Sequence, residues 1–175
     1  MSQLIYTSDN GYTWGEHRWR QKNVPYVESV RVPLVVRYDE MMGQERRVER
    51  RLVSNVDLAP TLTRLAGAEM SPNREGRNMV PLLRGRTGIS WRKQVLSEHG
   101  PDAPGSWCMF RGLRWKYVQY ENGEEELYYL AKDLDEMRNL AKRRRYRERI
   151  MDGRRQVLAS RCRPPNLTPL KVVTS

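Results

Sequence analysis

The sequence has only two cysteines and no long apolar run, and each shortage excludes a class of protein. With Cys108 and Cys162 alone, a disulfide framework and a four-thiolate zinc site are both excluded. No stretch approaches the roughly 18 apolar residues that a bilayer-spanning helix needs, so we expect no membrane span. Residues 1–6 also lack the charged start and the long apolar run of a signal peptide. The cellular compartment therefore stays unknown from sequence.

Positive charge is what the sequence has in excess. Its 175 residues include 32 Lys and Arg against 21 Asp and Glu, a formal net charge of +11. Such a balance fits binding to nucleic acid or to an anionic polysaccharide, and it also fits a merely basic surface. Much of the excess lies in the run KRRRYRERIMDGRR at 142–155, which we interpret as an exposed helical surface. The length suits one domain that buries roughly 70% of the surface of the unfolded chain.

The first 68 residues have the alternation of strands and helices that is typical of an α/β fold. VPLVVRY at 32–38 is nearly continuous in apolar residues, which indicates a strand buried on both faces, as in a parallel sheet. A later helix can begin with Asn55 or Asp57 as its N-cap and can end at Gly67. The expected elements are strands at 3–7, 32–38 and 51–53, a short helix at 26–30, and a helix with Leu58, Leu62 and Leu65 at helical spacing.

From about residue 69 the pattern changes to short strands, which favours an antiparallel sheet. The pair Asn122-Gly123 is a strong signal for a hairpin turn between two of the strands. The expected strands lie at 94–98, 107–111, 115–120 and 126–130, and the expected helices at 81–84, 133–141 and 146–160. We therefore expect an α/β part at 1–68, an antiparallel subdomain with a closing helix at 69–160, and a flexible tail at 161–175.

Polar side chains follow the first strand directly. Asp9 and Asn10 leave its carboxyl end, which is where open α/β sheets place ligands. A carboxylate and an amide oxygen suit Ca²⁺ or Mg²⁺ rather than a soft metal, although two oxygens are too few for a complete site. Lys22 would return to the same strand end and offer a cation to an anionic substrate group. Taken alone, Asp-Asn-Gly is more often an ordinary turn, and a single His17 is more often a hydrogen-bonded loop residue.

The longer sequence at 7–37 favours a functional site over an ordinary turn. TSDNGYTWGEHRWRQKNVPYVESVRVPLVVR at 7–37 resembles the sulfatase family, which has Ser-Asp-Asn-Gly, Gly-Glu-His, a Lys, and then Tyr-x-Glu-Ser-x-Arg-Val-Pro-Leu in this order. Further strings that resemble the family, in the same order, lie at 53–67, 74–85, 110–120 and 126–141. The resemblance covers about residues 3–141.

The resemblance implies a fold and a set of site residues. The fold would be the end of a sulfatase-like α/β core sheet, followed by a small antiparallel C-terminal subdomain with a closing helix. Asp9 and Asn10 look like two ligands of the active-site calcium, and Lys22 looks like the lysine that binds the sulfate group. His17 falls in a motif near the substrate, and we place it with Lys22 among the catalytic residues without assigning it a proton transfer.

One part of the family pattern is absent from these residues. Sulfatases use a formylglycine made within a Cys/Ser-x-Pro-Ser-Arg motif, and that motif does not occur in this sequence. CRPPN at 162–166 has a proline in the right place, but Pro165 and Asn166 stand where Ser and Arg are needed. The resemblance therefore implies a carboxy-terminal part that is inactive alone, with an upstream half of the same enzyme as a conceivable partner.

Three alternatives stay open beside a sulfuric ester hydrolase that acts on a sulfated small molecule or a sulfated glycan. The first is a catalytically inactive remnant that binds sulfated polyanions through its basic surface. The second is a phosphodiesterase or phosphatase of the same superfamily. The third is a nucleic-acid-binding module, which we disfavour because no helix-turn-helix, zinc-finger or ribonucleoprotein signature accompanies the charge.

Overall fold

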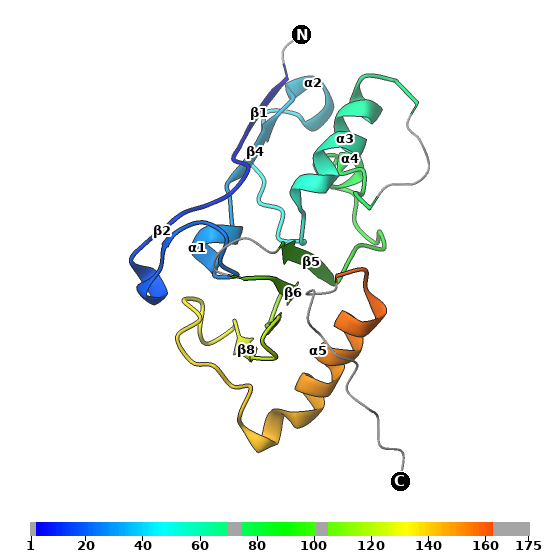
Figure 1. Ribbon diagram of the computed structural model, residues 1–175. Helices are drawn as coiled ribbons and strands as arrows, with labels where there is room; N and C mark the ends of the chain where they lie inside the picture. The colour runs from blue at the N-terminus through cyan, green and yellow to red at the C-terminus, as the bar shows by residue number, and fades with distance from the viewer. Residues whose placement is uncertain (1–2, 70–74, 101–104, 163–175) are drawn as a thin grey trace. The chain divides into compact units, whose positions relative to one another are not determined.

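A computed structural model describes residues 3–69, 75–100 and 105–162 of the chain. The chain divides into two compact units (Figure 1). Unit 1 comprises Met1–Asp9 and Val32–Val95, and unit 2 comprises Asn10–Arg31 and Leu96–Ser175. Each unit is described by itself. The division at residue 68 that the sequence suggests stays a prediction.

The sheet of unit 1 has two strands, β1 (Leu4–Thr7) and β4 (Leu34–Arg37). They pair antiparallel, with Ile5 opposite Val36. Side chains alternate between exposed and half-buried along both strands, and Leu4, Tyr6 and Val35 are each more than half exposed. The two strands are therefore where the sequence indicates, but the expected burial on both faces in a parallel arrangement is wrong for the described residues.

A capping box precedes the helical residues 55–65 of unit 1. Ser54 and Asp57 form a capping box in which the amide of Ser54 donates to the Asp57 carboxylate at 2.9 Å. The buried Asp57 carboxylate also accepts two bonds from the Arg92 guanidinium, at 2.7 and 2.5 Å. Residues 51–53 form no strand, contrary to expectation. The helical elements of this unit are α2 (Asp39–Met42), a 3₁₀ turn at Asn55–Asp57, α3 (Leu58–Leu65) and α4 (Val80–Leu83).

The main sheet contains four strands in the order β5-β6-β7-β8, and the paired strands β6, β7 and β8 are antiparallel. Their bounds agree closely with the sequence prediction: β5 (Gln94–His99), β6 (Trp107–Gly112), β7 (Trp115–Tyr120) and β8 (Glu125–Tyr129). The turn between β7 and β8 is the expected Asn122-Gly123 turn, in which Gly123 has a φ of 84°. Because few residues other than Gly and Asn adopt that φ easily, the hairpin is encoded locally.

Helix α5 (Arg147–Ala159) covers this sheet, preceded by a 3₁₀ turn at Arg144–Tyr146. Its buried residues Ile150, Gly153 and Val157 recur on one face and join a core with Tyr117 and Leu127. Gly153 lies so close to the Tyr117 ring that an added Cβ would come within 2.4 Å of it. Within α5, residues 147–155 of the basic run therefore form an amphipathic helix with an exposed charged face, as the sequence indicates.

The helix expected at 133–141 does not form. The Asp133 carboxylate accepts the amides of Met137 and Arg138, each at 2.9 Å. Asn139 Oδ1 accepts the amide of Leu127 at 3.1 Å, and Glu136 has a φ of 55°. The Asp133 carboxylate thus takes two backbone donors that a helix would have used, which is how Asp competes with helical structure.

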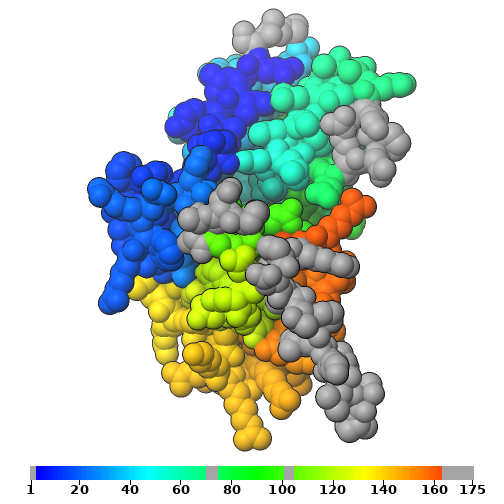
Figure 2. Space-filling view, in the orientation of Figure 1, coloured from blue at the N-terminus to red at the C-terminus, as the bar shows by residue number. Residues whose placement is uncertain are grey.

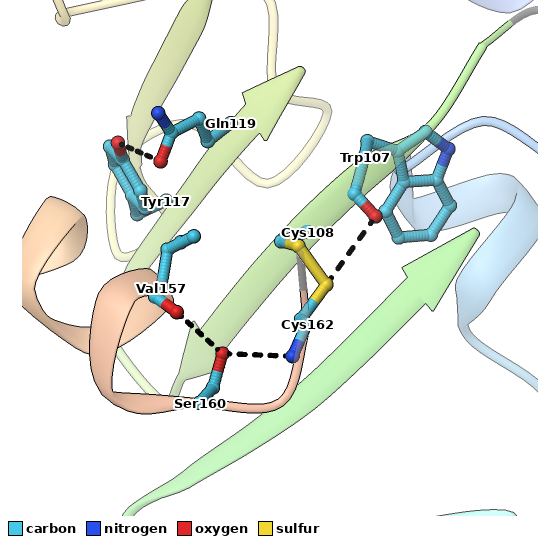
Figure 3. Close-up of a disulfide and its surroundings, with 7 residues drawn as sticks. All are labelled: Trp107, Cys108, Tyr117, Gln119, Val157, Ser160 and Cys162. Carbon is cyan, nitrogen blue, oxygen red and sulfur yellow. Dashed lines mark hydrogen bonds between the residues drawn. A yellow bond between two sulfur atoms is a disulfide. The ribbon is translucent and has the colours of Figure 1, made fainter. Parts of the chain in front are cut away.

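The two cysteines form a disulfide (Figure 3). It joins Cys108 of β6 to Cys162, which lies three residues after the end of α5. Both Cys108 and Cys162 are buried, and Ser160 Oγ accepts the amide of Cys162 at 3.2 Å. The sequence-based exclusion of a disulfide framework therefore left this one structural bridge unforeseen. The flexible tail expected at 161–175 stays a prediction. Residues 163–175, which include most of CRPPN, lie outside the described residues.

The fold is a mixture of helix and sheet, with an antiparallel four-stranded sheet and a C-terminal helix, as the sequence predicts. Among the helices of the described residues, none is both long and apolar enough to cross a membrane.

Candidate functional site

The candidate residues Asn10, His17 and Lys22 all lie in one segment of unit 2, residues 10–31. The segment contains the hairpin β2 (Thr13–Trp14) and β3 (Arg20–Gln21), a 3₁₀ turn at Glu16–Arg18, and helix α1 (Val27–Val30). The amide of Gly11 donates to the carbonyl of Ser29 at 2.8 Å, so the two ends of the segment meet. A Cβ at Gly11 would fall 1.9 Å from the Glu28 carbonyl oxygen, which explains the glycine at this position.

Lys22 returns to Asn10, as the sequence suggests. Its Nζ lies 3.2 Å from Asn10 Oδ1 and donates a hydrogen bond to it. The hairpin between them makes this possible, because Thr13 pairs with Gln21 across its two strands and Thr13 Oγ1 donates to the Gln21 carbonyl at 2.5 Å. A cation and an amide oxygen that are 12 residues apart in the chain are thus brought together.

Asp9 is the last residue of unit 1 before the chain enters unit 2 at Asn10. Its carbonyl oxygen accepts a hydrogen bond from Asn55 Nδ2 at 2.8 Å, and its Oδ1 accepts one from Ser8 Oγ at 3.4 Å. Asn55 lies at the start of the 3₁₀ turn before α3. The sequence pointed to Asn55 only as a helix cap, whereas its side chain fixes the backbone at Asp9.

His17 makes its contacts with α1 and the residue before it. The imidazole stacks on Tyr26, with 3.8 Å between ring centroids and 3° between the planes, and Nε2 lies 3.9 Å from Glu28 Oε2. The His17 side chain is only 9% exposed. This partner arrangement could not be read from the sequence, which gives no signal that a loop histidine will meet an aromatic ring nine positions later.

A buried ion pair holds the segment against the main sheet. Lys116 of β7 and Glu136 are both fully buried and are paired with each other. Lys116 Nζ donates to the carbonyl of Pro25, and Glu136 Oε2 accepts the amide of Val27 at 3.1 Å. Burial opposes both charges, because it lowers the pKa of Lys116 and raises the pKa of Glu136. The pair therefore fixes the backbone at Pro25 and Val27, shortly after Lys22.

A second contact fixes the same stretch from strand β6. Trp107 Nε1 donates to the carbonyl of Asn23 at 2.8 Å. Val24 and Tyr26 pack with Tyr128 and Leu130 in a small buried cluster. The sequence reasoning missed these residues, because each lies more than 80 positions from the residue it contacts.

The donor chemistry of Asp9 and Asn10 fits a hard divalent cation. One carboxylate and one amide oxygen are of the kind that Ca²⁺ takes, and Ca²⁺ takes about 6–8 of them. Within the part of the chain that the structure describes, no cluster of three or more His, Cys, Asp or Glu side chains could hold a metal ion. Asp9 and Asn10 therefore fit calcium as two of its ligands.

Comparisons with known proteins identify the family. Residues 15–162 match the family model described as N-sulphoglucosamine sulphohydrolase, C-terminal. The N-acetylglucosamine-6-O-sulfatase of Bacteroides thetaiotaomicron is 33% identical over 146 residues, which cover 78% of this chain and 26% of that protein. The chain thus spans about a quarter of the length of the curated relatives it matches.

Solved structures show the same likeness in three dimensions. A protein of Bacteroides thetaiotaomicron assigned to the sulfatases superposes with a TM-score of 0.79 and 31% identity, over 90% of this chain and 35% of that one. The phosphonate monoester hydrolase of Agrobacterium radiobacter superposes with a TM-score of 0.77 and 29% identity, over 90% and 34%. Because the family model matches residues 15–162, most of this chain, the chain belongs to the sulfatase family and corresponds to the family's C-terminal part.

Proposed function

We propose that this chain supplies the C-terminal part of a sulfuric ester hydrolase, in which Lys22 binds the sulfate group and Asp9 and Asn10 provide two calcium ligands. The observation that supports the proposal best is the hydrogen bond of 3.2 Å from Lys22 Nζ to Asn10 Oδ1. Bound calcium would supply positive charge that attracts and orients the anionic group. Lys22 would act beside it as a point charge, offsetting the negative charge that grows on the sulfate oxygens in the transition state.

The proposed role of His17 is to shape the hairpin that carries Lys22. The His17 ring is mostly buried, stacks at 3.8 Å on Tyr26 and has Nε2 3.9 Å from Glu28 Oε2, so its position is fixed. A group held so firmly suits a fixed position near substrate better than a proton shuttle that must change partners. Lys22, whose residue is exposed, remains able to meet a ligand.

The proposed substrate is a sulfate ester on a sugar or another small molecule. The named activity of the Bacteroides relative, on N-acetylglucosamine 6-O-sulfate groups, supports a sulfated glycan. The structural likeness to a phosphonate monoester hydrolase supports a second candidate, an ester of phosphorus. Both esters present negatively charged oxygens that a lysine can bind, so the two candidates are separated by assay.

A chimaera tests the proposal. The matched part of the Bacteroides N-acetylglucosamine-6-O-sulfatase is replaced by this 175-residue chain, and hydrolysis of a nitrophenyl sulfate and of a nitrophenyl phosphonate monoester is measured. We expect the chimaera to prefer the sulfate. We expect Lys22→Ala to lower kcat by about 10²–10³, the range for loss of one group that stabilises transition-state charge.

Two controls accompany the kcat measurement on Lys22→Ala. Arg155→Ala removes an exposed cation of α5 and should leave kcat within about twofold, since distant surface charges are largely screened. The isolated chain should show no turnover, because the formylglycine motif is absent from its residues. A folded chimaera whose turnover is unchanged by Lys22→Ala would contradict the role given to Lys22.

Calcium binding by the isolated chain is expected to be weak, with a dissociation constant above about 10 μM. Two oxygens satisfy only a minority of the 6–8 positions around Ca²⁺, and tight sites require most of them from the protein. Isothermal titration calorimetry of the chain and of Asp9→Ala measures this, with the exposed Asp152→Ala as the control carboxylate. Binding tighter than 10 μM that disappears in Asp9→Ala would mean that the chain holds a fuller site.

A further inference from the structure

The β2–β3 hairpin exposes aromatic side chains that the proposed chemistry does not use. Trp14 is 74% exposed and Trp19 is 42% exposed, and Tyr12 lies beside Trp14 with 4.6 Å between ring centroids. In the space-filling view the hairpin, in medium blue at one edge, lies at the surface (Figure 2). Single exposed aromatics are ordinary, but the adjoining rings of Tyr12 and Trp14 form an apolar surface of the kind that binds a ligand.

The backbone of the same hairpin is strained. His17, Arg18, Gln21 and Asn23 all have positive φ, at 52°, 63°, 105° and 77°. Among the described residues the only other non-glycine with positive φ is Glu136. Such conformations cost on the order of 1–3 kcal/mol each and persist only where the surroundings fix them, typically at ligand sites.

Several contacts hold the hairpin backbone in these conformations. Glu16 Oε2 accepts the amide of Trp14 at 2.6 Å across the tip of the hairpin. The base is held by the bond from Thr13 to Gln21, and the tip is also held by the stack of His17 on Tyr26. The aromatic side chains therefore project from a backbone that is already ordered, which lowers the entropy cost of binding.

The charge around these rings is basic. Arg18, Arg20 and Lys22 are all exposed, whereas Glu16 is engaged by the backbone and Glu28 faces His17 at 3.9 Å. Hydrogen bonds from backbone amides lower the pKa of Glu16, so it stays ionised without needing a ligand cation. The planar guanidinium of arginine donates two parallel bonds, a geometry that matches the oxygens of an anionic group.

We infer that the hairpin is a binding platform for a sulfated saccharide chain. The Trp14 face packs on the apolar C–H face of a sugar ring, and Arg18 and Arg20 bind sulfate groups other than the one at Lys22. The inference rests on the proposed function for the choice of a saccharide, because Lys22 in the same segment is assigned to a sulfate ester. It adds a contact for the part of the ligand that does not react.

Binding of a size-defined heparin octasaccharide to the full 175-residue chain tests the platform, in EDTA and at 150 mM salt, by titration calorimetry. We expect Trp14→Ala to weaken binding about tenfold, Trp14→Phe to retain most of it, and the control Arg155→Ala to stay within twofold. The N- and O-desulfated octasaccharide should bind at least tenfold more weakly. Thermal melting checks the folding of each variant, and the exposure of Trp14 makes its loss tolerable.

Three results would overturn the platform: Trp14→Ala binding within twofold of the parent chain, equal binding of the desulfated sugar, or equal binding of an eight-nucleotide single-stranded DNA. The readout is independent of turnover, so the two proposals can fail separately. A chimaera that depends on Lys22, together with octasaccharide binding that is indifferent to Trp14, rejects the platform alone. Trp14-dependent binding of the sulfated sugar supports the platform even where the chimaera is indifferent to Lys22.

Discussion

Glu136→Ala is expected to lower the free energy of unfolding of unit 2 by about 3–5 kcal/mol, because it leaves the buried Lys116 ammonium without its counter-charge. The carbonyl of Pro25 and the rings of Tyr26 and Tyr128, each 5.6 Å from Lys116 Nζ, remain but do not neutralise it. Chemical denaturation measures the loss. Hydrogen exchange at Val27, whose amide loses its acceptor, reports the loosening of the segment next to Lys22.

Two variants separate the charge from the side chain. Lys116→Met combined with Glu136→Gln removes both buried charges and keeps an oxygen for the Val27 amide, so most of the stability should return. Asp152→Ala breaks the exposed pair with Arg155 at 3.3 Å and should cost less than about 1 kcal/mol. A cost below about 1 kcal/mol for Glu136→Ala would show that the pair does not hold the segment.

Loss of the disulfide is the second large effect that we expect. Cys108 and Cys162 are separated by 54 positions, and the chain-entropy model assigns a loop of that size about 4 kcal/mol of stabilisation. The double variant Cys108→Ala with Cys162→Ala should therefore lower the denaturation midpoint markedly. Both cysteines lie in the core with Tyr117 and Val157.

Reductant provides the matched control for this prediction. The parent chain in dithiothreitol should unfold close to the double variant, and the double variant should be indifferent to dithiothreitol. The two parent curves would coincide if the bridge were not formed in solution. In that case, no covalent bond would fix the position of Cys162 after α5.

Elements with local signals were predictable from the sequence. The β7–β8 hairpin follows from Asn122-Gly123, and α5 follows from buried positions spaced along one face. The helix expected at 133–141 was wrong because helical propensity ignores side-chain acceptors such as Asp133 and Asn139. The partner of Lys116 was invisible for a related reason, since Glu136 reaches it from a turn with positive φ rather than from a helix.

One contact within the candidate site was predictable from the sequence, whereas the contacts that support it were not. The order of Asp9, Asn10 and Lys22 along the chain led to the expectation that Lys22 returns to Asn10, and the two side chains do meet at 3.2 Å. Two supporting contacts depend on tertiary packing, which residue spacing does not encode. They are the stack of His17 on Tyr26 and the hydrogen bond from Trp107 to the carbonyl of Asn23. The roles of the site residues stay predictions for the experiments above.

The disulfide also changes what a protease can release. Lys142, Arg143, Arg144 and Arg145 are all exposed and lie between the two cysteines, just before α5. A tryptic cut in that run would break the peptide chain without freeing the helix, because the bond from Cys108 to Cys162 still joins the two pieces. Nicked molecules would then migrate as one species until a reducing agent separated them.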